Sequence, residues 1–341
     1  MGVIRTVLGD VASDRVGAAM IHEHLLFDIV PPGATGDRDA PIRPKDRWQI
    51  DYRSNEAPAN AHQTNREVAA AELRAFAADG GTLVVDQSVH GLRRDAEGLA
   101  QISRESGVHV VAAAGTYTEP FLPPEVAALD TAALAARFIQ EVTHGLDGGD
   151  VPAGLVGEIG CSWPIAPVER RALTAAAITQ QETGAAISVH PGRAPGACSE
   201  ILDILGAAGA DLSRVILCHM DRTHPDGSGI EALLDRGAAV EWDFFGIEQS
   251  HYWMGDVELP TDLGRLRLIR RLADLGHADR LLISHDICTR TRMRRWGGHG
   301  YGHILRNVRP LMDRLRFPKA LKQALLRDNA IRFLTLLERP A

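Results

Sequence analysis

The feature that most constrains the fold is a regular alternation of short apolar segments with longer amphipathic ones. Eight segments of strand length are rich in β-branched and other apolar residues, and the segments between them have the length and composition of helices. Three of these helices end in glycine just before a strand, in ADGGTLVV, ETGAAISV and DRGAAVEW, as helix capping predicts. The expected strands are 18–24, 82–88, 109–115, 154–160, 185–191, 214–220, 238–245 and 280–286, and the expected helices are 64–78, 95–105, 130–144, 167–182, 196–207, 228–236 and 262–275.

Repeated βα units of this kind predict a parallel α/β sheet, because strands that are apolar on both faces need cover on both sides. Eight units predict closure into a (β/α)8 TIM barrel. The 341 residues suit one barrel, so we expect 1–341 to form a single domain with C-terminal helices after the last strand. An open, doubly wound sheet is the alternative.

One segment is too long for a minimal barrel. Residues 28–63, directly after the first strand, are rich in Pro, Gly and Asp. A loop of this length in a compact domain is usually functional or disordered. Since it follows a barrel strand, we expect it to lie over the barrel mouth as a lid or substrate wall.

The composition narrows the class of function. A net charge of −7 argues against a nucleic-acid surface, which needs a basic face. No segment approaches the roughly 20 apolar residues of a membrane span, and the N-terminus lacks a secretory signal. The four cysteines form no C-x-x-C pair, which indicates reduced thiols. We therefore expect a cytoplasmic protein with a small-molecule substrate, no nucleic-acid or membrane partner and, if it assembles, a homodimer.

Polar side chains collect at the ends of these apolar strands. On a strand, His22 and His24 point the same way while Glu23 points the other way. In a barrel, the C-terminal ends of the strands share one mouth, where catalytic groups gather. Each residue alone has a structural explanation, such as a core hydrogen bond or a helix cap, but together they predict a metal site. The candidate ligands are His22, His24, Glu158, His190, His219 and Asp286.

The alternation of side chains decides between neighbours. His285 and Asp286 point to opposite sides of the last strand. We assign Asp286 to the mouth, because four imidazoles need anionic charge and a base, and His285 to the outside. Glu23 then enters the layer between strands and helices, where a carboxylate needs a buried partner. For Asp86 and Asp243, two further acids near strand ends, we expect structural hydrogen bonds.

The ligand types indicate the metal and the chemistry. Imidazole with carboxylate suits divalent Zn, Mn, Co, Ni or Fe, and disfavours an all-oxygen Ca or Mg site. Six ligands exceed what one catalytic ion with an open position uses, so we expect two divalent metal ions per chain, Zn first, sharing a carboxylate and a hydroxide. Such a centre lowers the pKa of water from 15.7 to about 7 and polarises a substrate oxygen. Asp286 would accept the proton and pass it to the leaving group.

The loops give weaker indications of the substrate. Four arginines lie within 290–295 of this acidic chain, and a guanidinium suits carboxylate, phosphate or sulfonate. Arg292 is our first choice for binding an anionic substrate group. Arg193 and Arg222 are similar candidates, with a structural ion pair as the alternative for each. Tyr117 is a candidate donor to a substrate carbonyl, with packing at the rim as its alternative.

An ordered set of motifs resembles a known family. The motifs are MIHEHL, GGTLVVD, GEIGCS, SVHPGR, CHMDRT, WDFFG, LLISHDICTRTR and GGHGYGHIL, and they span nearly the whole chain. In this set the chain resembles the phosphotriesterase-related family of the amidohydrolase superfamily. Glu158 stands where the namesake phosphotriesterases have a bridging carboxylated lysine, so the resemblance implies a binuclear centre but puts phosphotriesterase activity in doubt. By that resemblance one ion would be bound by His22, His24 and Asp286, and the other by His190 and His219, with Glu158 bridging them.

The expected function is a binuclear metal-dependent hydrolase. A metal-bridging hydroxide would act on a small ester, lactone or N-acyl amide that carries an anionic group. The resemblance does not choose among these, since the family contains lactone, amide and phosphotriester hydrolases. One alternative is hydrolysis of a phosphotriester or another phosphoester. Another is a non-catalytic ligand-binding barrel, against which the retention of all six candidate ligands argues.

Overall fold

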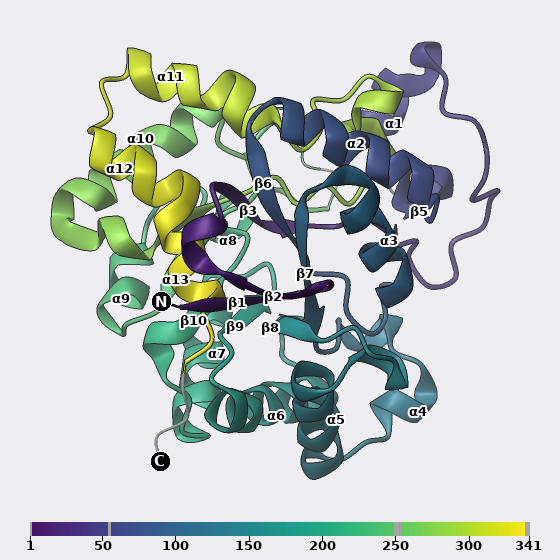
Figure 1. Ribbon diagram of the computed structural model, residues 1–341, viewed down its shortest axis with the longest axis vertical. Coiled ribbons are helices and arrows are strands. Elements are labelled where there is room, and N and C mark those ends of the chain that lie inside the picture. Colours follow the sequence, from purple (N-terminus) through teal and green to yellow (C-terminus); the bar gives the residue numbers. More distant parts are fainter. Residues whose placement is uncertain (1, 54–55, 249–251, 253, 338–341) are drawn as a thin grey trace.

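The protein forms a barrel of eight parallel strands, seen in a computed structural model that describes residues 2–53, 56–248, 252 and 254–337 (Figure 1). Each strand pairs with the next one along the chain. The first and last strands meet through hydrogen bonds to the carbonyl of His22, from Ser284 Oγ at 2.8 Å and from Asp286 N at 3.0 Å. The expected TIM barrel is therefore confirmed. Its strands are β3 (Ala18–Glu23), β6 (Gly81–Asp86), β7 (His109–Ala114), β8 (Ala153–Gly160), β9 (Ile187–His190), β10 (Val215–Leu217), β11 (Ala239–Trp242) and β12 (Leu281–Ile283).

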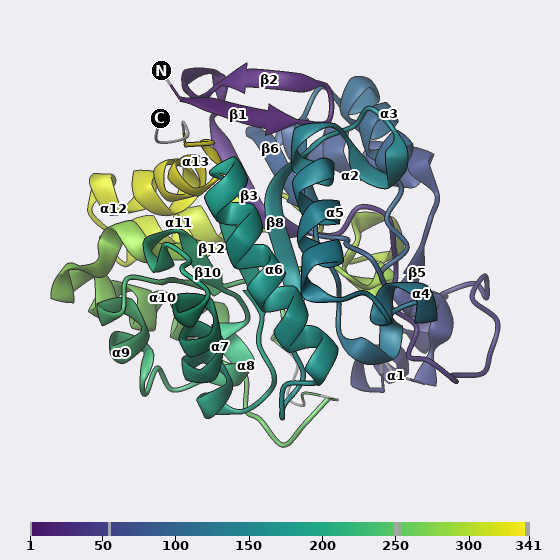
Figure 2. The same ribbon diagram turned by 90° about the horizontal axis from the view of Figure 1, so that it is seen from below.

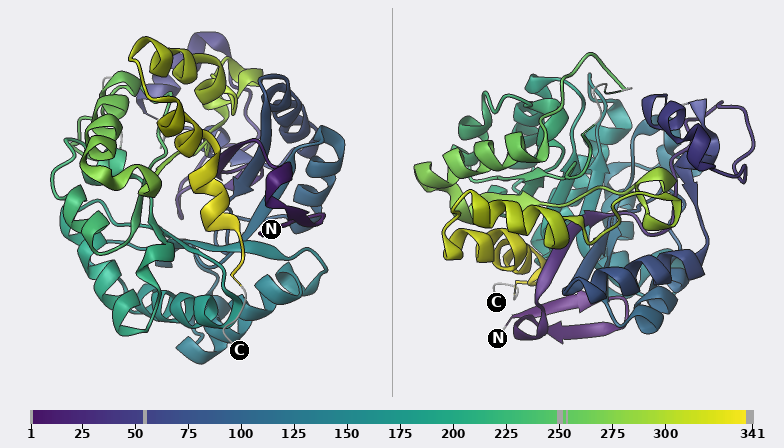
Figure 3. Two further views of the ribbon diagram at one scale, coloured as in Figure 1. Left: turned by 60° about the vertical axis from the view of Figure 1, so that its left-hand side comes forward. Right: turned by 90° about the horizontal axis from the view of Figure 1, so that it is seen from above.

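Helices surround the barrel, and each expected helix has a counterpart among them (Figures 1 and 3). The side chains of Asn65, Asp95 and Asp130 accept hydrogen bonds from the first turn of the following helix, which explains where three of them begin. The helices are α1 (Arg47–Tyr52), α2 (Arg66–Ala78), α3 (Ala96–Ser106), α4 (Pro124–Ala127), α5 (Thr131–Thr143), α6 (Pro167–Thr183), α7 (Pro195–Ala207), α8 (Met220–Thr223), α9 (Ile230–Asp235), α10 (Asp262–Leu272), α11 (Arg309–Arg314), α12 (Lys319–Gln323) and α13 (Asn329–Leu334).

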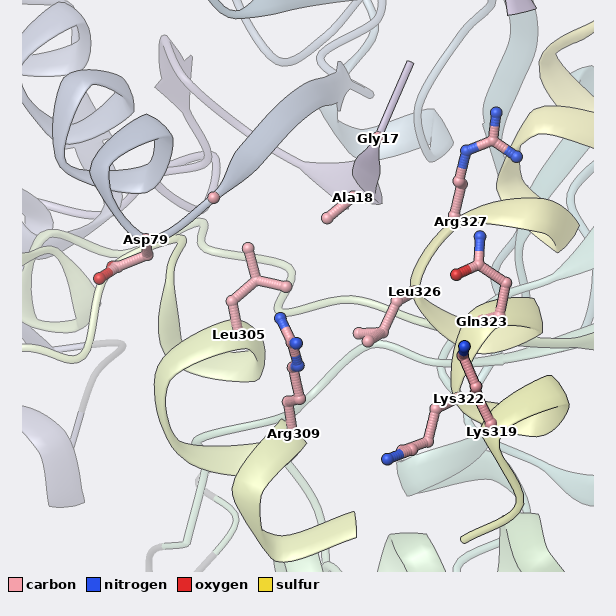
Figure 4. Close-up of a pocket in the computed structure, with 11 residues that line it drawn as sticks. Gly17, Ala18, Asp79, Leu305, Arg309, Lys319, Lys322, Gln323, Leu326 and Arg327 are labelled. Carbon is pink, nitrogen blue, oxygen red and sulfur yellow. The ribbon is translucent and has the colours of Figure 1, made fainter. Parts of the chain in front are cut away.

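The N-terminal end of the barrel is closed. Strands β1 (Val3–Thr6) and β2 (Gly9–Ala12) form a hairpin there, and Ile4 and Val16 pack with Phe333 of α13 against the barrel interior. The hairpin and both chain ends lie at this end (Figures 2 and 3). A pocket of about 440 Å³ opens at the start of β3, and Arg309 of α11 and Lys319 and Lys322 of α12 line it (Figure 4). The candidate ligands lie at the other ends of the strands.

The long segment 28–63 forms a wall over the mouth, as expected. Its two ends are tied together by the short antiparallel strands β4 (Phe27–Asp28) and β5 (His62–Gln63). Five residues of the segment line a cavity of about 150 Å³ together with Tyr117 and His190. They are Ile29, Pro31, Ala57, Pro58 and Ala61.

Two further expectations concern the whole chain. Among the described residues, the structure has no helix that is both long enough and apolar enough to cross a bilayer. The four cysteines are all free, and three of them are buried.

Candidate metal centre

The structure brings all six predicted ligands together at the C-terminal mouth of the barrel. His22, Glu158 and His190 belong to β3, β8 and β9, while the other three follow the ends of β3, β10 and β12. Every one of the six side chains is buried, with at most 7% of the residue exposed. Their donor atoms form three overlapping groups: His22, His24 and Glu158; His22, His219 and Asp286; and Glu158, His190 and His219.

One group of atoms has the spacing of ligands around a single ion. His24 Nε2 lies 3.3 Å from Asp286 Oδ1 and 3.4 Å from Glu158 Oε1. His22 Nε2 lies 3.7 Å from Glu158 Oε2 and 3.9 Å from Asp286 Oδ1. Ligands about 2.1 Å from one tetrahedral ion are about 3.4 Å apart. The four side chains therefore leave room for one divalent ion between them.

The second group shares Glu158 with the first. Its Oε2 atom lies 2.9 Å from His190 Nδ1 and 3.4 Å from His219 Nε2. The two imidazole nitrogens are 2.9 Å from each other. Because Oε1 faces His24 while Oε2 faces these two histidines, the carboxylate lies between the two groups of imidazoles.

The buried polar atoms support the same interpretation. Neither ring nitrogen of His22 has a hydrogen-bond partner. A buried polar group without a partner is costly and needs an explanation. A divalent ion beside Nε2 would supply the missing partner, and imidazole with carboxylate is a donor set that such ions accept. These residues therefore fit the two ions that the sequence analysis predicted.

Charge in the cluster keeps both carboxylates ionised. Burial raises the pKa of Glu158, but the nearby imidazoles of His190, His219 and His24 outweigh it and hold the pKa well below its ordinary value. Burial is likewise outweighed at Asp286, where the hydrogen bond from His24 and the charge of His22 lower the pKa to about 2. Each group is therefore an anion at neutral pH, as a metal ligand must be.

Two of the six residues have unusual backbone conformations. His219 has φ of 59° and Asp286 has φ of 48°, in the left-handed region that non-glycine residues rarely adopt. Asp243 holds His219 in place, because its carboxylate accepts hydrogen bonds from His219 N at 2.9 Å and from Nδ1 at 2.8 Å. The structural role expected for Asp243 is confirmed. Such strain, where surrounding contacts impose it, is typical of functional sites.

The alternation along the last strand is also confirmed. Asp286 faces the ligand cluster, whereas His285 points away from it and its Nδ1 lies 2.6 Å from Glu23 Oε1. Glu23 also accepts hydrogen bonds from Ser284 Oγ and from the main chain of residues 285 and 287, so its carboxylate has the buried partners it needed. Asp86 accepts hydrogen bonds from Leu25 N and Ser88 N, as a structural acid should.

A buried ion pair behind the cluster supports Asp243. Arg265 is fully buried and binds the carboxylates of Asp221 and Asp262. Asp221 in turn accepts hydrogen bonds from the main chain of Asp243 and Phe244. The pair therefore fixes the turn that positions His219.

We expect Arg265→Met to lower the free energy of unfolding by about 3–5 kcal/mol, because removing one partner leaves buried charge uncompensated. Chemical denaturation of the metal-free chain measures the loss. The matched control is Arg267→Met, on the exposed face of the same helix, where a change within about 0.5 kcal/mol is expected. Equal stability of the two variants would contradict the structural role of the pair.

Two of the predicted substrate residues line the cavity beside the ligand cluster. Arg193 and Tyr117 lie on its wall next to His190. The Tyr117 ring makes an edge contact with the His190 ring, with centroids 5.0 Å apart. Arg193 donates from Nε to the hydroxyl of Tyr252 at 3.3 Å and from Nη2 to Met254 Sδ at 3.4 Å. The guanidinium of Arg193 therefore bonds to neighbouring side chains of the cavity, and no carboxylate of the described residues pairs with it.

The other two predicted arginines bind the main chain. The guanidinium of Arg292 donates to the carbonyls of Asp286, His285 and Phe245. Arg222 donates to the carbonyl of Pro191 at 2.9 Å, and its Nη2 lies 3.1 Å from His190 Nε2. Both side chains are buried. The structure therefore places Arg292 differently from its expected position on a substrate anion, because the loop after β12 folds back over its own carbonyls.

The comparisons with known proteins agree with this geometry. A protein-family sequence model described as "Phosphotriesterase family" matches residues 2–334 of the chain. The chain belongs to the phosphotriesterase family. Human N-acetyltaurine hydrolase is 37% identical, over 98% of each chain. The resiniferatoxin-binding protein of Rhodobacter sphaeroides is 33% identical with a TM-score of 0.91, covering 98% of this chain and 95% of that one. The phosphotriesterase homology protein of Escherichia coli is 28% identical with a TM-score of 0.78, covering 94% and 99%.

Membership of the phosphotriesterase family gives the general activity. Together with the ligand clusters, it identifies the chain as a metal-dependent hydrolase of the amidohydrolase type. The names of its relatives include N-acetyltaurine hydrolase and phosphotriesterase-related protein, so the family name does not specify a substrate.

Two polar residues beside the ligand cluster were not predicted from the sequence. Glu241 lies in the middle of β11 and Cys218 directly follows β10, and both belong to a group of potential metal ligands with His22 and Asp243. A carboxylate inside an otherwise apolar strand was the available signal.

Proposed function

We propose that the protein hydrolyses a small N-acyl amide whose amine portion carries a sulfonate or carboxylate. The observation that carries the proposal is a cavity which joins three kinds of surface. His190 of the ligand cluster lines the cavity on one side. The cationic side chain of Arg193 and apolar residues of 28–63 line the rest of it. The name of the human relative, N-acetyltaurine hydrolase, fits such a substrate, because it describes an N-acyl aminosulfonate.

The metal centre is the first part of the proposed mechanism. His22, His24 and Asp286 would hold one divalent ion, His190 and His219 would hold the other, and Glu158 would bridge them, with Zn and then Mn the first ions to test. When bound, such ions lower the pKa of water and polarise the carbonyl of a substrate.

The remaining steps belong to the chain. Asp286, which is ionised at neutral pH, would accept the proton of the attacking water and deliver it to the leaving nitrogen. Arg193 would bind the anionic end of the substrate through charge-assisted hydrogen bonds. The Tyr117 hydroxyl would donate to the acyl oxygen. The apolar wall from 28–63 would pack on the acyl group and exclude bulk water.

The apolar cavity of about 150 Å³ has the size of a short acyl group. A second pocket of about 390 Å³ shares His190 and Arg193 with it, so activity has to decide between this proposal and its alternatives. The test compares metal-free and metal-loaded protein on N-acetyltaurine, N-acetyl amino acids, neutral amides, lactones and an aryl phosphotriester. We expect the highest kcat/KM with the anionic N-acyl amides, and only with metal. Preference for lactones or the triester, or binding of ligands without turnover, would contradict the proposal.

Replacing Arg193 with Gln tests the recognition of the anion. Because a hydrogen bond to a charged group contributes about 1.5–3 kcal/mol, we expect KM for N-acetyltaurine to rise by about 10-fold to 100-fold. The KM for a neutral amide of similar size should not change. Steady-state kinetics with both substrates measure the difference, and Arg104→Gln, at an exposed position of α3, is the control. Equal effects on both substrates would remove Arg193 from this role.

A further inference from the structure

A fully buried carboxylate lies inside the barrel next to the ligand cluster. Glu241 is 0% exposed and belongs to the short strand β11. The interior of a TIM barrel is normally filled by branched apolar side chains. Here the interior cluster includes Ile216, Ala239 and Leu282, and Leu282 is the partner of Glu241 in the pairing of β11 with β12. Burying an acid in such surroundings is costly unless it is paired, so this side chain needs a functional or structural partner.

The contacts of Glu241 point to one of the proposed ligands. Its Oε2 atom accepts a hydrogen bond from Cys218 Sγ at 3.4 Å and lies 3.4 Å from His22 Nδ1, while Oε1 has no partner. Cys218 is itself 3.1 Å from Ser188 Oγ. The Glu241 oxygen that faces His22 therefore has the weak thiol donor of Cys218 as its hydrogen-bond partner, and the facing His22 Nδ1 has none.

The other carboxylate near His22 Nδ1 already has partners. Asp243 Oδ2 is the next carboxylate oxygen, at 3.5 Å. That oxygen already accepts a hydrogen bond from His219 N at 2.9 Å, and the other oxygen of Asp243 binds His219 Nδ1. Both oxygens of Asp243 thus accept hydrogen bonds from His219, whereas the Glu241 oxygen nearest His22 accepts the weaker hydrogen bond of a thiol.

We propose that Glu241 is a positioning residue for His22. Its carboxylate accepts a hydrogen bond from the N–H at Nδ1, which leaves Nε2 without a proton and turns the lone pair of Nε2 toward Glu158 and Asp286. A ligating histidine usually donates its other N–H to a carboxylate or carbonyl, which fixes its tautomer and ring orientation and makes it a better ligand. The inference rests on the proposed function, because it takes His22 to be a ligand of the first ion.

The same group of side chains is less suited to hold an ion of its own. The thiolate, not the thiol, is the form of cysteine that binds metals. The Sγ atom of Cys218 donates a hydrogen bond to Glu241 Oε2 and lies 3.1 Å from Ser188 Oγ, so the thiol already has two protein partners. With Asp243 committed to His219, the geometry favours a hydrogen-bonded support over a third metal site.

Two replacements of Glu241 separate positioning from a merely structural role. Glu241→Met is apolar and of similar length, and replacing a buried charge with a well-packed apolar group is often neutral or stabilising. We therefore expect the metal-free variant to melt no lower than the metal-free wild type. The affinity for the first ion should nevertheless fall by about 10-fold to 100-fold. Glu241→Gln should lower the affinity in the same direction, since the amide lacks the negative charge.

The experiment titrates metal-free full-length protein with Zn²⁺ in a chelator-buffered series and with Co²⁺, whose visible absorption reports ligand geometry. The wild type should bind two ions. In both variants the Co²⁺ spectrum of the site that includes His22 should change. The matched control is Glu72→Gln. This buried acid binds the main chain of Arg294 and Arg295 and contacts no proposed ligand, so its loss should lower the melting temperature and leave metal affinity unchanged.

The outcomes separate this inference from the proposed function. Two ions bound by the wild type, with undiminished affinity in Glu241→Met and Glu241→Gln, overturn the positioning role alone. A third ion in the wild type that both variants lose overturns it as well, in favour of a metal site at Cys218 and Glu241. A wild type that binds no divalent ion overturns the metal centre, and the inference falls with it.

Discussion

Asp286→Asn is expected to lower kcat by about 10²-fold to 10⁴-fold while much of the metal stays bound. The rate falls because a positioned general base contributes that much, and the amide of Asn cannot accept the proton. The metal is largely retained because Asn keeps one oxygen at the position of Oδ1, and five other proposed ligands remain. Turnover of N-acetyltaurine and metal content per chain, measured on the same preparation, check both parts.

The control for Asp286→Asn is Asp203→Asn, an exposed acid on α7 that is paired with Arg236. It should leave both the rate and the metal content unchanged. A rate near that of the wild type in Asp286→Asn would remove Asp286 from the role of base. Complete loss of metal would show that its main contribution is as a ligand.

The parts of the structure predicted from sequence follow from simple periodicities. Strand alternation placed His285 and Asp286 on opposite sides, and the structure has them pointing to Glu23 and to the cluster respectively. The repeat of eight βα units predicted the barrel and its shared mouth, because the eight strand ends have to meet there. Neither result needed knowledge of a contact.

The parts that sequence could not supply depend on how loops and interior layers pack. Arg292 was chosen for its charge and position, but its partners are carbonyls that become available only when the loop after β12 folds back. The short strand β11 gave no sign of which residue its Glu241 would face, since His22 is far away in sequence. The Arg292 contacts depend on how its own loop folds, and the contact of Glu241 with His22 joins distant segments, so strand and helix periodicity encodes neither.

Glu158→Gln is expected to have the largest effect on metal binding, lowering the affinity for both ions by more than about 100-fold. The carboxylate takes part in both donor groups, with Oε1 facing His24 and Oε2 facing His190 and His219. A neutral amide offers one oxygen and no negative charge, so it cannot bridge two cations. The loss should therefore exceed the 10-fold to 100-fold effect of removing a residue that only orients a ligand.

The contrast with Glu241→Gln makes the bridging role of Glu158 testable in one titration. Both variants exchange a buried carboxylate for an amide, so general effects of the exchange are matched. If Glu158 bridges the ions, its variant loses both binding steps, whereas the Glu241 variant loses affinity only at the ion beside His22. A Glu158→Gln protein that still loads two ions with undiminished affinity would count against bridging. The shared position of Glu158 between two groups of imidazoles would then need another explanation, such as hydrogen bonds from the surrounding histidine rings.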